Sequence, residues 1–404
     1  MARTITGIDI GSAYIKVAVC DESQSDRSIV IKALVKTESD GLKNGNVINP
    51  ETVSESLLKT LREAEKVSGE RIRKAHISIG GSGLGTIVDS STVAVSRADS
   101  IVSEFDVARV LEESEDRLKE RVNIKIIHTI PSEFKVDGRK VIGKPCGYVG
   151  NKLELKTVFI TCLSPSLDAL VTAVENTGVE VENVYTGPIA ESIATLSATS
   201  RNAGCALVNI GAETVSILTH EDGLPTSLKV FPIGSTHVTH DIALGLRIPL
   251  DEAERLKISG SEDKRVTKRI DDIVEARLSD IFELIETHLK KIGRSGLLPA
   301  GVIFTGGGAN IKGIEEIARK QLSLPAKIAR NIFTENKRQD SGNRGRDGLK
   351  DRERADKGRE PEWSGVIGLS MLGLLLGEPE ESLGLRVVKK TRKGLVSFIR
   401  QFLP

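Results

Sequence analysis

Hydrophobic and polar residues alternate along the chain with two periods, and the order of these periods predicts a mixed α/β fold. Residues 4–20 read TITGIDIGSAYIKVAVC, in which β-branched residues alternate about Gly11 as they do in a β-hairpin. Residues 49–69 place apolar side chains at helical spacing before a glycine, which predicts a helix that ends near Ser68. Residues 74–81, KAHISIGG, then have the pattern of a short buried strand.

The later part of the chain repeats these patterns with one interruption. Between residues 82 and 160 the order strand, helix and strands predicts a small α+β unit inserted into the surrounding fold. A second hairpin at residues 207–217, LVNIGAETVSI, precedes two amphipathic helical regions, and residues 301–322 predict a strand, a glycine turn and a helix. Residues 366–377 are the longest apolar run, but 12 residues fall short of the ~20 that cross a bilayer, so a buried helix is predicted.

Residues 336–360 differ from the rest of the chain. Nine of these 25 residues are basic, six are acidic and only two are apolar. Such a segment buries too little surface to offset the entropy of ordering it, so the composition predicts a charged, disordered surface loop.

Composition narrows the class of protein and of partner. The chain has 404 residues and is 39% hydrophobic, which suits two to four soluble globular domains. With 57 basic against 56 acidic residues, the chain lacks the positive electrostatic field typical of nucleic-acid-binding proteins. With 3% aromatic residues, it also lacks their surfaces for base stacking. Its four cysteines have no CxxC spacing, which favours a reducing cytoplasm over a disulfide framework. His237 and His240 are three apart but have no third metal ligand nearby.

Three glycine turns, each directly after a strand, are the candidate chemistry. They lie in residues 7–16 (GIDIGSAYIK), 208–217 (VNIGAETVSI) and 303–313 (IFTGGGANIKG). Glycine lets backbone approach phosphate oxygens closely, and the amides of a tight turn can hold a phosphate. Two similar hairpins predict a duplicated fold whose halves face each other, and the third turn opens a helix whose N-terminus favours an anion. Each turn alone is most often an ordinary turn, but three in this order favour a nucleotide site.

In this order the motifs resemble the actin-like ATPase superfamily and, in more detail, the FtsA family of actin-like bacterial cell-division proteins. The inserted unit is the most specific part, with HTIPSEFKVDG, GKPCGYVGNKLEL and VFIT, because sugar kinases, heat-shock chaperones and actin do not share it. GSTHVTHDIALGLRIPLDEAERLK, TGGGAN and EWSGVIGLSMLGLLL also match, so the resemblance covers nearly all of residues 4–333 and 361–377. It implies an α/β protein with a duplicated actin-like (ribonuclease H-like) fold, an inserted α+β domain and a C-terminal amphipathic helix.

The resemblance also implies a division of the chain. The expected parts are subdomain 1A (1–81, 161–203 and a returning helix at 361–377), inserted subdomain 1C (82–160), subdomain 2A (204–224 and 298–333), subdomain 2B (225–297), a charged loop (334–360), a linker (378–390) and an amphipathic membrane-targeting helix (391–404).

ATP and Mg²⁺ are the cofactors that the resemblance implies. Asp9 would act on Mg²⁺ through water, and Lys16 is also suited to phosphate because a lysine on a glycine hairpin is a mobile positive charge. Glu254 and Lys257, three apart on one helical face, would reach the ribose and adenine, unless they form a surface ion pair. The other expected nucleotide contacts are Gly11, Ser12, Gly306, Gly307, Gly308 and Asn310.

The second hairpin departs from the superfamily pattern of aspartate, an apolar residue, three glycines and threonine. Asn209 stands in the aspartate position and lacks the charge that would orient magnesium-bound or attacking water. Glu213 adds a carboxylate, which at ~4 Å and an effective dielectric of 20 would repel a phosphate charge by about 4 kcal/mol. Glu213 therefore either points away or takes over the metal-directing role, and we favour the first, which predicts ATP binding with almost no turnover. The expected contacts from this hairpin are Gly211, Ala212, Glu213 and Thr214.

The last residues predict a helix that lies in a membrane surface. Residues 386–400 contain six basic residues and no acidic one, and a helix from about Gly394 places apolar side chains on one face. Each basic residue contributes about 1 kcal/mol at an anionic leaflet, so one tail binds weakly and a filament of many binds strongly. The alternative is a helix that docks on the body of the protein. The expected membrane contacts are Lys389, Lys390, Arg392, Lys393, Leu395, Phe398, Ile399, Phe402 and Leu403.

These features predict an ATP-binding cytoskeletal adaptor of cell division rather than an enzyme. By the resemblance it would form actin-like filaments with itself, bind the FtsZ C-terminal peptide, sit on the cytoplasmic face of the cell membrane at the division site and recruit other division proteins, with no nucleic acid partner. The peptide site would lie in residues 225–297, where the basic candidates are Arg277, Lys290, Lys291 and Arg294. Two alternatives stay open: a pilus-assembly scaffold of the PilM type, against which the amphipathic tail argues, and an ATPase or kinase on the same fold.

Overall fold

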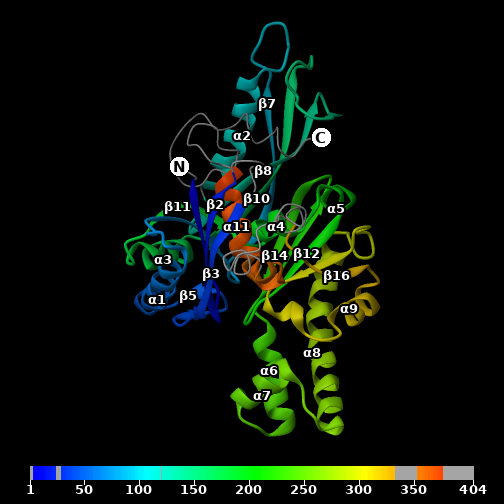
Figure 1. Ribbon diagram of the computed structural model, residues 1–404. Helices are drawn as coiled ribbons and strands as arrows, with labels where there is room; N and C mark the ends of the chain where they lie inside the picture. The colour runs from blue at the N-terminus through cyan, green and yellow to red at the C-terminus, as the bar shows by residue number, and fades with distance from the viewer. Residues whose placement is uncertain (1–2, 24–28, 120, 333–352, 376–404) are drawn as a thin grey trace, which may run out of the picture.

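The first half of the molecule is built on a five-stranded sheet with the strand order β11-β6-β1-β2-β3 (Figure 1). The computed structural model describes residues 3–23, 29–119, 121–332 and 353–375. β1 is parallel to β6 and forms the predicted hairpin with β2, while β6 is parallel to β11. The strands are β1 (Thr4–Ile10), β2 (Tyr14–Glu22), β3 (Ile29–Glu38), β6 (Lys74–Ile79) and β11 (Glu180–Thr186), with a two-stranded ribbon β4 (Leu42–Lys43) and β5 (Asn46–Val47) beside them. Helices α1 (Pro50–Ser68) and α3 (Ser164–Glu175) pack against each other and against this sheet.

The second half repeats this strand order as β16-β15-β12-β13-β14. β12 is parallel to β15 and forms the second predicted hairpin with β13. The strands are β12 (Cys205–Ile210), β13 (Val215–Glu221), β14 (Leu224–Phe231), β15 (Val302–Thr305) and β16 (Ala326–Ile328). Because β14 pairs with β13, the sheet of this half extends to Phe231, beyond the boundary expected at residue 224. The same order of parallel and antiparallel neighbours in both halves confirms the predicted duplicated fold.

The inserted α+β unit continues the sheet of the second half at one end of the molecule (Figure 1). It consists of β7 (Gly85–Ala94), α2 (Glu104–Lys119), β8 (Ile124–Val136), β9 (Arg139–Val141) and β10 (Lys152–Leu163). β10 pairs antiparallel with both β7 and β8, and β7 meets β14 through the pair Lys229 and Gly85. The unit has its own apolar core, to which Val110 on α2 and Leu153 on β10 belong.

Three helices form the opposite end of the molecule. They are α6 (Ser235–Leu246), α7 (Leu250–Ser259) and α8 (Lys264–Lys291). The apolar face of α8 packs against α6 and α9 (Ile314–Leu322), which confirms the amphipathic helix predicted for this region. The remaining short elements are α5 (Ala198–Ala203) and the 3₁₀ turns η1 (Gly307–Asn310) and η4 (Pro361–Trp363).

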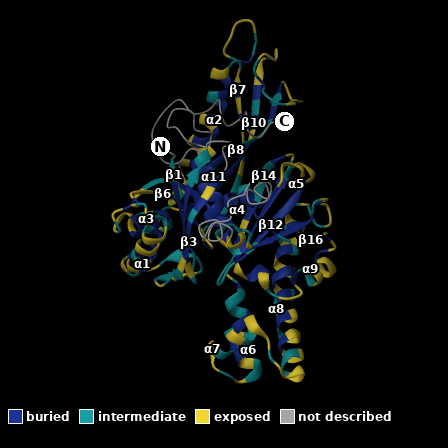
Figure 2. Ribbon diagram, viewed as in Figure 1, coloured by how far each residue is buried: buried dark blue, intermediate teal, exposed yellow. Residues whose placement is uncertain are grey.

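Two helices pack together between the halves (Figure 2). α4 (Gly187–Thr195) connects the first half to the second, and α11 (Ser364–Leu375) returns to the first half and lies on β1. α11 is buried along most of its length, as predicted for the long apolar run. Among the residues that the structure describes, no helix is both long and apolar enough to cross a membrane.

The charged segment is structured at its end, where the sequence predicted disorder. Residues 353–358 are helical, and the amide of Asn331 donates to the carbonyl of Gly358 at 2.5 Å. The ammonium of Lys357 lies 5.0 Å from the ring centre of Trp363, a cation–π contact. The prediction of a loop up to residue 360 was therefore wrong for these residues, because long-range contacts hold a stretch that composition alone would leave unfolded. Residues 333–352 and 376–404, including the expected membrane helix and all its contact residues, lie outside the described residues.

Candidate functional site

The two hairpin turns have the same geometry. In the first turn the amide of Gly11 donates to the carbonyl of Tyr14 at 3.1 Å. In the second the amide of Gly211 donates to the carbonyl of Thr214 at 2.9 Å. Each turn follows the carboxyl end of the middle strand of the five that build its half, β1 or β12, which is the edge where open α/β sheets bind ligands.

Both turns present backbone amides to a ligand. Within the described residues, the amides of Ser12 and Ala13 in the first turn and of Ala212 and Glu213 in the second donate no hydrogen bond. All four residues are partly exposed. Successive unengaged amides in a turn form a concavity that binds anions, so this pair of turns fits a phosphate chain.

A third turn, between β4 and β5, closes on both hairpins. The amide of Asn44 donates to Oε2 of Glu213 at 2.6 Å, and the amide of Gly45 donates to Oγ of Ser12 at 3.0 Å. Glu213 on the second half is thus hydrogen-bonded to the first half. This contact favours the expectation that the Glu213 carboxylate points away from the phosphates.

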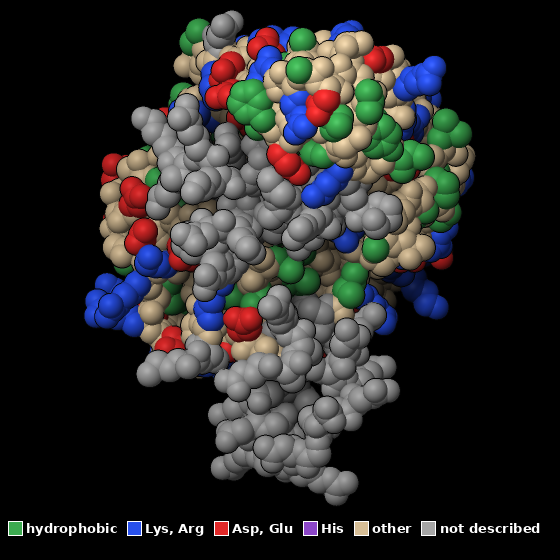
Figure 3. Space-filling view, turned by 90° about the horizontal axis from the view of Figure 1, so that it is seen from above, with side chains coloured by type: hydrophobic (Ala, Val, Ile, Leu, Met, Phe, Trp, Pro, Cys, Tyr) green, Lys and Arg blue, Asp and Glu red, His purple; other side chains and the backbone are tan. Residues whose placement is uncertain are grey.

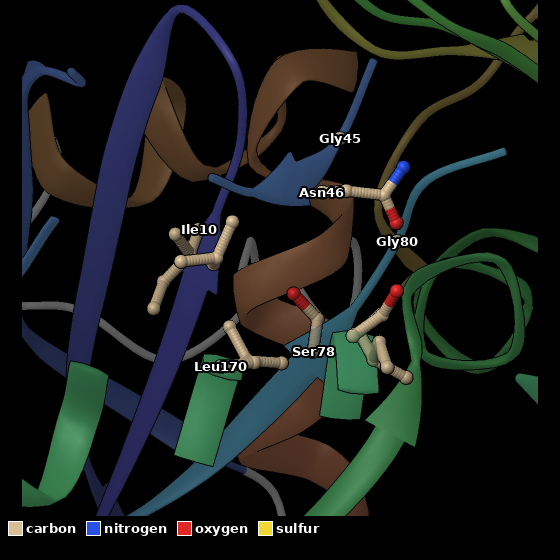
Figure 4. A pocket seen from close by; sticks show the side chains of 9 residues that line it. Ile10, Gly45, Asn46, Ser78, Gly80 and Leu170 are labelled. Atoms are coloured by element: carbon tan, nitrogen blue, oxygen red, sulfur yellow. The ribbon is translucent and has the colours of Figure 1, made fainter. Parts of the chain in front are cut away.

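Asp9 lies at the end of β1 with its carboxylate fixed by a neighbour. The hydroxyl of Ser78, near the end of the parallel strand β6, donates to Oδ1 of Asp9 at 2.5 Å. Ser78 also lines a cavity of about 10 Å³, room for one water, whose lining residues are drawn in Figure 4. It is lined by Ile10, Gly45, Asn46, Val47, Ser78, Ile79, Gly80, Ser166 and Leu170.

Lys16 lies directly opposite Asp9 on the second strand of the same hairpin, so the two side chains are on one face of the sheet. Its ammonium donates to the carbonyl of Glu362 at 2.6 Å and lies 6.0 Å from the ring centre of Trp363. The carboxylate of Glu362 in turn accepts from the ammonium of Lys36 at 2.9 Å. The expected phosphate-binding lysine is therefore positioned by η4, the turn that precedes the returning helix.

Glu191 was not expected at the site. It lies on α4, is 5% exposed, and its Oε2 accepts from the hydroxyl of Thr305 at 2.8 Å. Its Oε1 accepts from the side-chain amide of Asn209. Burial raises the pKa of this carboxyl to about 7, and the nearby charge of Asp9 adds to the shift. The one sequence signal is that Glu191 is the only charged residue in the helix GPIAESIAT.

The third glycine turn packs against the second hairpin. Gly306 and Gly308 are buried on the end of β12, and a Cβ on Gly306 would lie 2.5 Å from Oδ1 of Asn209. Gly306 also has a φ of 82°, which glycine adopts without strain. Gly307 and Asn310 are exposed, so of the expected adenosine contacts these two are open to a ligand.

Glu254 and Lys257 are connected to the second phosphate turn. Their side chains form an ion pair at 2.6 Å, and the Lys257 side chain is 10% exposed. The Lys257 ammonium also donates to the carbonyl of Ser235 at 3.4 Å, while the amide of Ser235 donates to the carbonyl of Gly211 at 2.9 Å. The alternative of an ordinary surface pair does not describe Lys257, which is largely buried next to the turn.

The basic candidates for a peptide site differ in how firmly they are paired. Arg277 donates to both carboxylate oxygens of Asp241, at 2.6 and 3.0 Å. Arg294 donates to Glu221 at 2.5 Å. Lys290 has a looser partner in Glu286 at 3.5 Å, and Lys290 and Lys291 are both exposed at the end of α8.

Comparison with known proteins identifies relatives over most of the chain. The family model described as cell division protein FtsA matches residues 206–345, and that of the SHS2 domain inserted in FTSA matches residues 81–161. Cell division protein FtsA of Bacillus subtilis is 30% identical over 344 residues, which cover 80% of this chain and 77% of that protein. Cell division protein FtsA of Pseudomonas aeruginosa is 27% identical over 394 residues, which cover 92% of this chain and 89% of that protein.

Solved structures with low sequence identity share the fold. The PilM–PilN type IV pilus biogenesis complex contains a chain with a TM-score of 0.64 and 17% identity, over 92% of this chain and 98% of that one. The ethanolamine utilization protein EutJ from Carboxydothermus hydrogenoformans has a TM-score of 0.52 and 16% identity, over 91% and 89% of the two chains. These likenesses establish the actin-like fold alone.

Proposed function

The chain belongs to the FtsA family of cell-division proteins, and on that premise we propose that it binds ATP, forms actin-like filaments and tethers FtsZ filaments to the membrane. The observation that supports nucleotide binding is the pair of equivalent turns with unengaged amides, to both of which the β4–β5 turn is hydrogen-bonded. A phosphate chain held between the two turns would bridge the halves of the molecule. The nucleotide would then stabilise the closed form that a filament subunit needs.

Magnesium fits the donors of this site. Mg²⁺ binds through one or two carboxylates together with phosphate oxygens and water. The Asp9 carboxylate, oriented by Ser78, supplies one such group beside the first turn. Lys16 would balance phosphate charge when it leaves the carbonyl of Glu362.

In self-association, the inserted unit of one copy would contact the opposite end of the next copy. The inserted unit exposes Ile142 and Val149, and the opposite end exposes Leu244 and Ile258, with residue exposures from 71% to 88%. Figure 3, seen from above, shows hydrophobic side chains among charged ones over the end that carries the inserted unit. Contact between unlike ends of successive copies generates an open filament when the rotation from one copy to the next does not close a ring. Ile142→Asp is expected to abolish sedimentation of ATP-dependent polymers.

The FtsZ peptide would bind near the end of α8. Arg277 and Arg294 are engaged by carboxylates at 2.6 Å or less, whereas Lys290 and Lys291 are exposed and more available to an acidic peptide. The double variant Lys290→Glu/Lys291→Glu is expected to weaken FtsZ peptide binding about tenfold by charge reversal. The double variant Lys264→Glu/Lys268→Glu, at two exposed lysines near the other end of the same helix, changes the net charge equally and is the matched control.

The membrane contact is assigned to residues 386–404, from the sequence pattern and the family resemblance. It would place the protein on the cytoplasmic face of the cell membrane at the division site, where other division proteins join it. Deletion of these residues should abolish flotation with anionic vesicles and leave binding of the FtsZ peptide unchanged.

The decisive experiment for the nucleotide is a fluorescence titration. Trp363 is the only tryptophan of the chain and lies beside Lys16. Addition of ATP with Mg²⁺ should change its emission with saturable dependence on concentration, and Lys16→Met should lower the affinity. No change in emission, together with no heat of binding in calorimetry, would refute nucleotide binding. Failure to capture FtsZ or anionic vesicles would instead favour a scaffold or an enzyme on the same fold.

A further inference from the structure

Glu191 stands beside the one position where the nucleotide site lacks an expected acid. α4 starts directly after β11, at the carboxyl edge of the first sheet, yet the Glu191 side chain reaches the second half. There it contacts Asn209 on β12 and Thr305 at the end of β15. A carboxylate from the first half thus occupies the end of the central strand of the second.

The internal symmetry defines what Asn209 replaces. Asp9 pairs with Lys16 across the first hairpin, and Asn209 pairs with Ser216 across the second, each one residue from its turn-facing end. Asn209 is therefore the structural equivalent of Asp9. The first position has a carboxylate of its own, and the second has an amide that holds the carboxylate of Glu191.

This pairing explains why position 209 carries no acid. The Asn209 amide donates to Glu191, a contact that an aspartate could not make. An aspartate there would bring two carboxylates into contact, and two such groups cannot both be ionised. The amide at 209 and the carboxylate at 191 therefore form one unit.

Glu191 can still accept hydrogen bonds from a ligand. Each of its oxygens accepts one hydrogen bond, so each retains a lone pair. A Cβ on Gly365 would lie 3.7 Å from Oε1 of Glu191 and 3.3 Å from Oδ2 of Asp9, so the two carboxylates flank the same glycine. Glycine at 365 keeps the space between them clear of a side chain.

We propose that Glu191 is the second carboxylate of the nucleotide site and holds magnesium-bound water there in place of an acid at position 209. The inference rests on the proposed binding of ATP. Among the described residues no group of three or more His, Cys, Asp or Glu side chains could hold a metal alone. A pair of carboxylates suffices for Mg²⁺ when phosphate and water complete its shell.

The test exchanges the acid and the amide between positions 191 and 209. Calorimetry measures the affinity for ATP in Mg²⁺ and in EDTA, for wild type, Glu191→Gln, Asn209→Asp and the double variant Glu191→Gln/Asn209→Asp. The gain in affinity that Mg²⁺ gives should fall about tenfold or more in Glu191→Gln, as for other groups that orient metal ligands. The double variant should regain it to within about threefold, since the glutamine amide introduced on α4 would donate to the new carboxylate on β12.

Controls separate this role from a purely structural one. Glu175→Gln on the surface of α3 removes the same charge and should leave the Mg²⁺ effect unchanged. Electron paramagnetic resonance of Mn²⁺ in place of Mg²⁺ gives a second readout, with a broadened spectrum in wild type and the double variant only. The inference about Glu191 would be overturned if the Mg²⁺ effect survived in Glu191→Gln, or if it stayed lost in a folded double variant. Neither result would contradict the proposed binding of ATP. A wild type that binds no ATP would overturn the proposed function as well.

Discussion

The contact between Glu213 and Asn44 makes a prediction that separates the two possible roles of Glu213. The Glu213 carboxylate accepts from the Asn44 amide at 2.6 Å and so connects the two halves. Glu213→Ala removes this acceptor and its charge, whereas Glu213→Gln removes the charge and keeps an acceptor oxygen. Both variants should therefore loosen the closed form, and Ala should do so more.

The size of the effect follows from the environment of the bond. A hydrogen bond to a charged group contributes about 1.5–3 kcal/mol when water is excluded. Glu213 is half-buried, so water replaces part of the lost interaction and the lower end applies. We expect Glu213→Ala to lower the free energy of unfolding by about 1–1.5 kcal/mol, and Glu213→Gln by about half as much.

Urea unfolding without nucleotide, followed by the fluorescence of Trp363, measures this difference. Glu262→Ala, at an exposed glutamate before α8, changes the net charge equally and should leave the midpoint in place. ATP affinity in Mg²⁺ should stay within about threefold of wild type, because the carboxylate faces Asn44.

Two results would refute this reasoning. A rise in ATP affinity of about a hundredfold in Glu213→Ala, equal to about 2.7 kcal/mol, would mean that the carboxylate faces the phosphates. Loss of Mg²⁺-dependent binding in both variants would mean that Glu213 directs the metal. In that case the role proposed for Glu191 would also fail.

Three further predictions concern other parts of the molecule. Burial lowers the pKa of His128 to about 3, below the 6.5 of the unfolded chain. As pH falls the unfolded chain binds the proton first, so stability present above pH 6.5 is lost between 6.5 and about 3, by about 1.4 kcal/mol per pH unit. Urea midpoints at pH 7 and 5 should show a slope that is smaller in His128→Gln. Lys16→Met should shift the emission of Trp363 even without ATP, because it removes a cation 6.0 Å from the ring; unchanged emission would contradict the contact. Arg277→Lys should lower the thermal midpoint because it loses the two-point contact with Asp241, and an equal midpoint would show that contact to be dispensable.

Local pattern was enough to predict the elements that hold the site. The hairpin at residues 4–20, the helix that ends at Ser68 and the buried returning helix all follow from hydrophobic period and glycine position. The equivalence of the two hairpins could be predicted because their sequences are similar. Each of these signals lies within a short stretch of sequence, and the structure formed there follows local propensity.

Contacts between distant residues were beyond the sequence. The Asn44 amide meets a side chain 169 residues away, and Thr305 meets one 114 residues away. No periodicity encodes which residues meet across a cleft. The prediction of disorder for the charged segment was wrong at residues 353–358 for the same reason, since contacts with the distant Asn331 and with Trp363 hold them in place.

Glu191 and Asn209 show why a single position is a poor guide to lost chemistry. In the sequence of the hairpin, Asn209 replaces an acid, which predicts weak binding of a metal. In the folded protein the site has two carboxylates, because the amide of Asn209 donates to the carboxylate of Glu191 on α4. An acid at 209 alone would bring two carboxyl groups into contact, which cannot both be ionised, and would remove the hydrogen bond that the Asn209 amide donates to Glu191. Asn209→Asp alone should therefore lower the thermal midpoint. The double variant Glu191→Gln/Asn209→Asp should keep the midpoint of wild type.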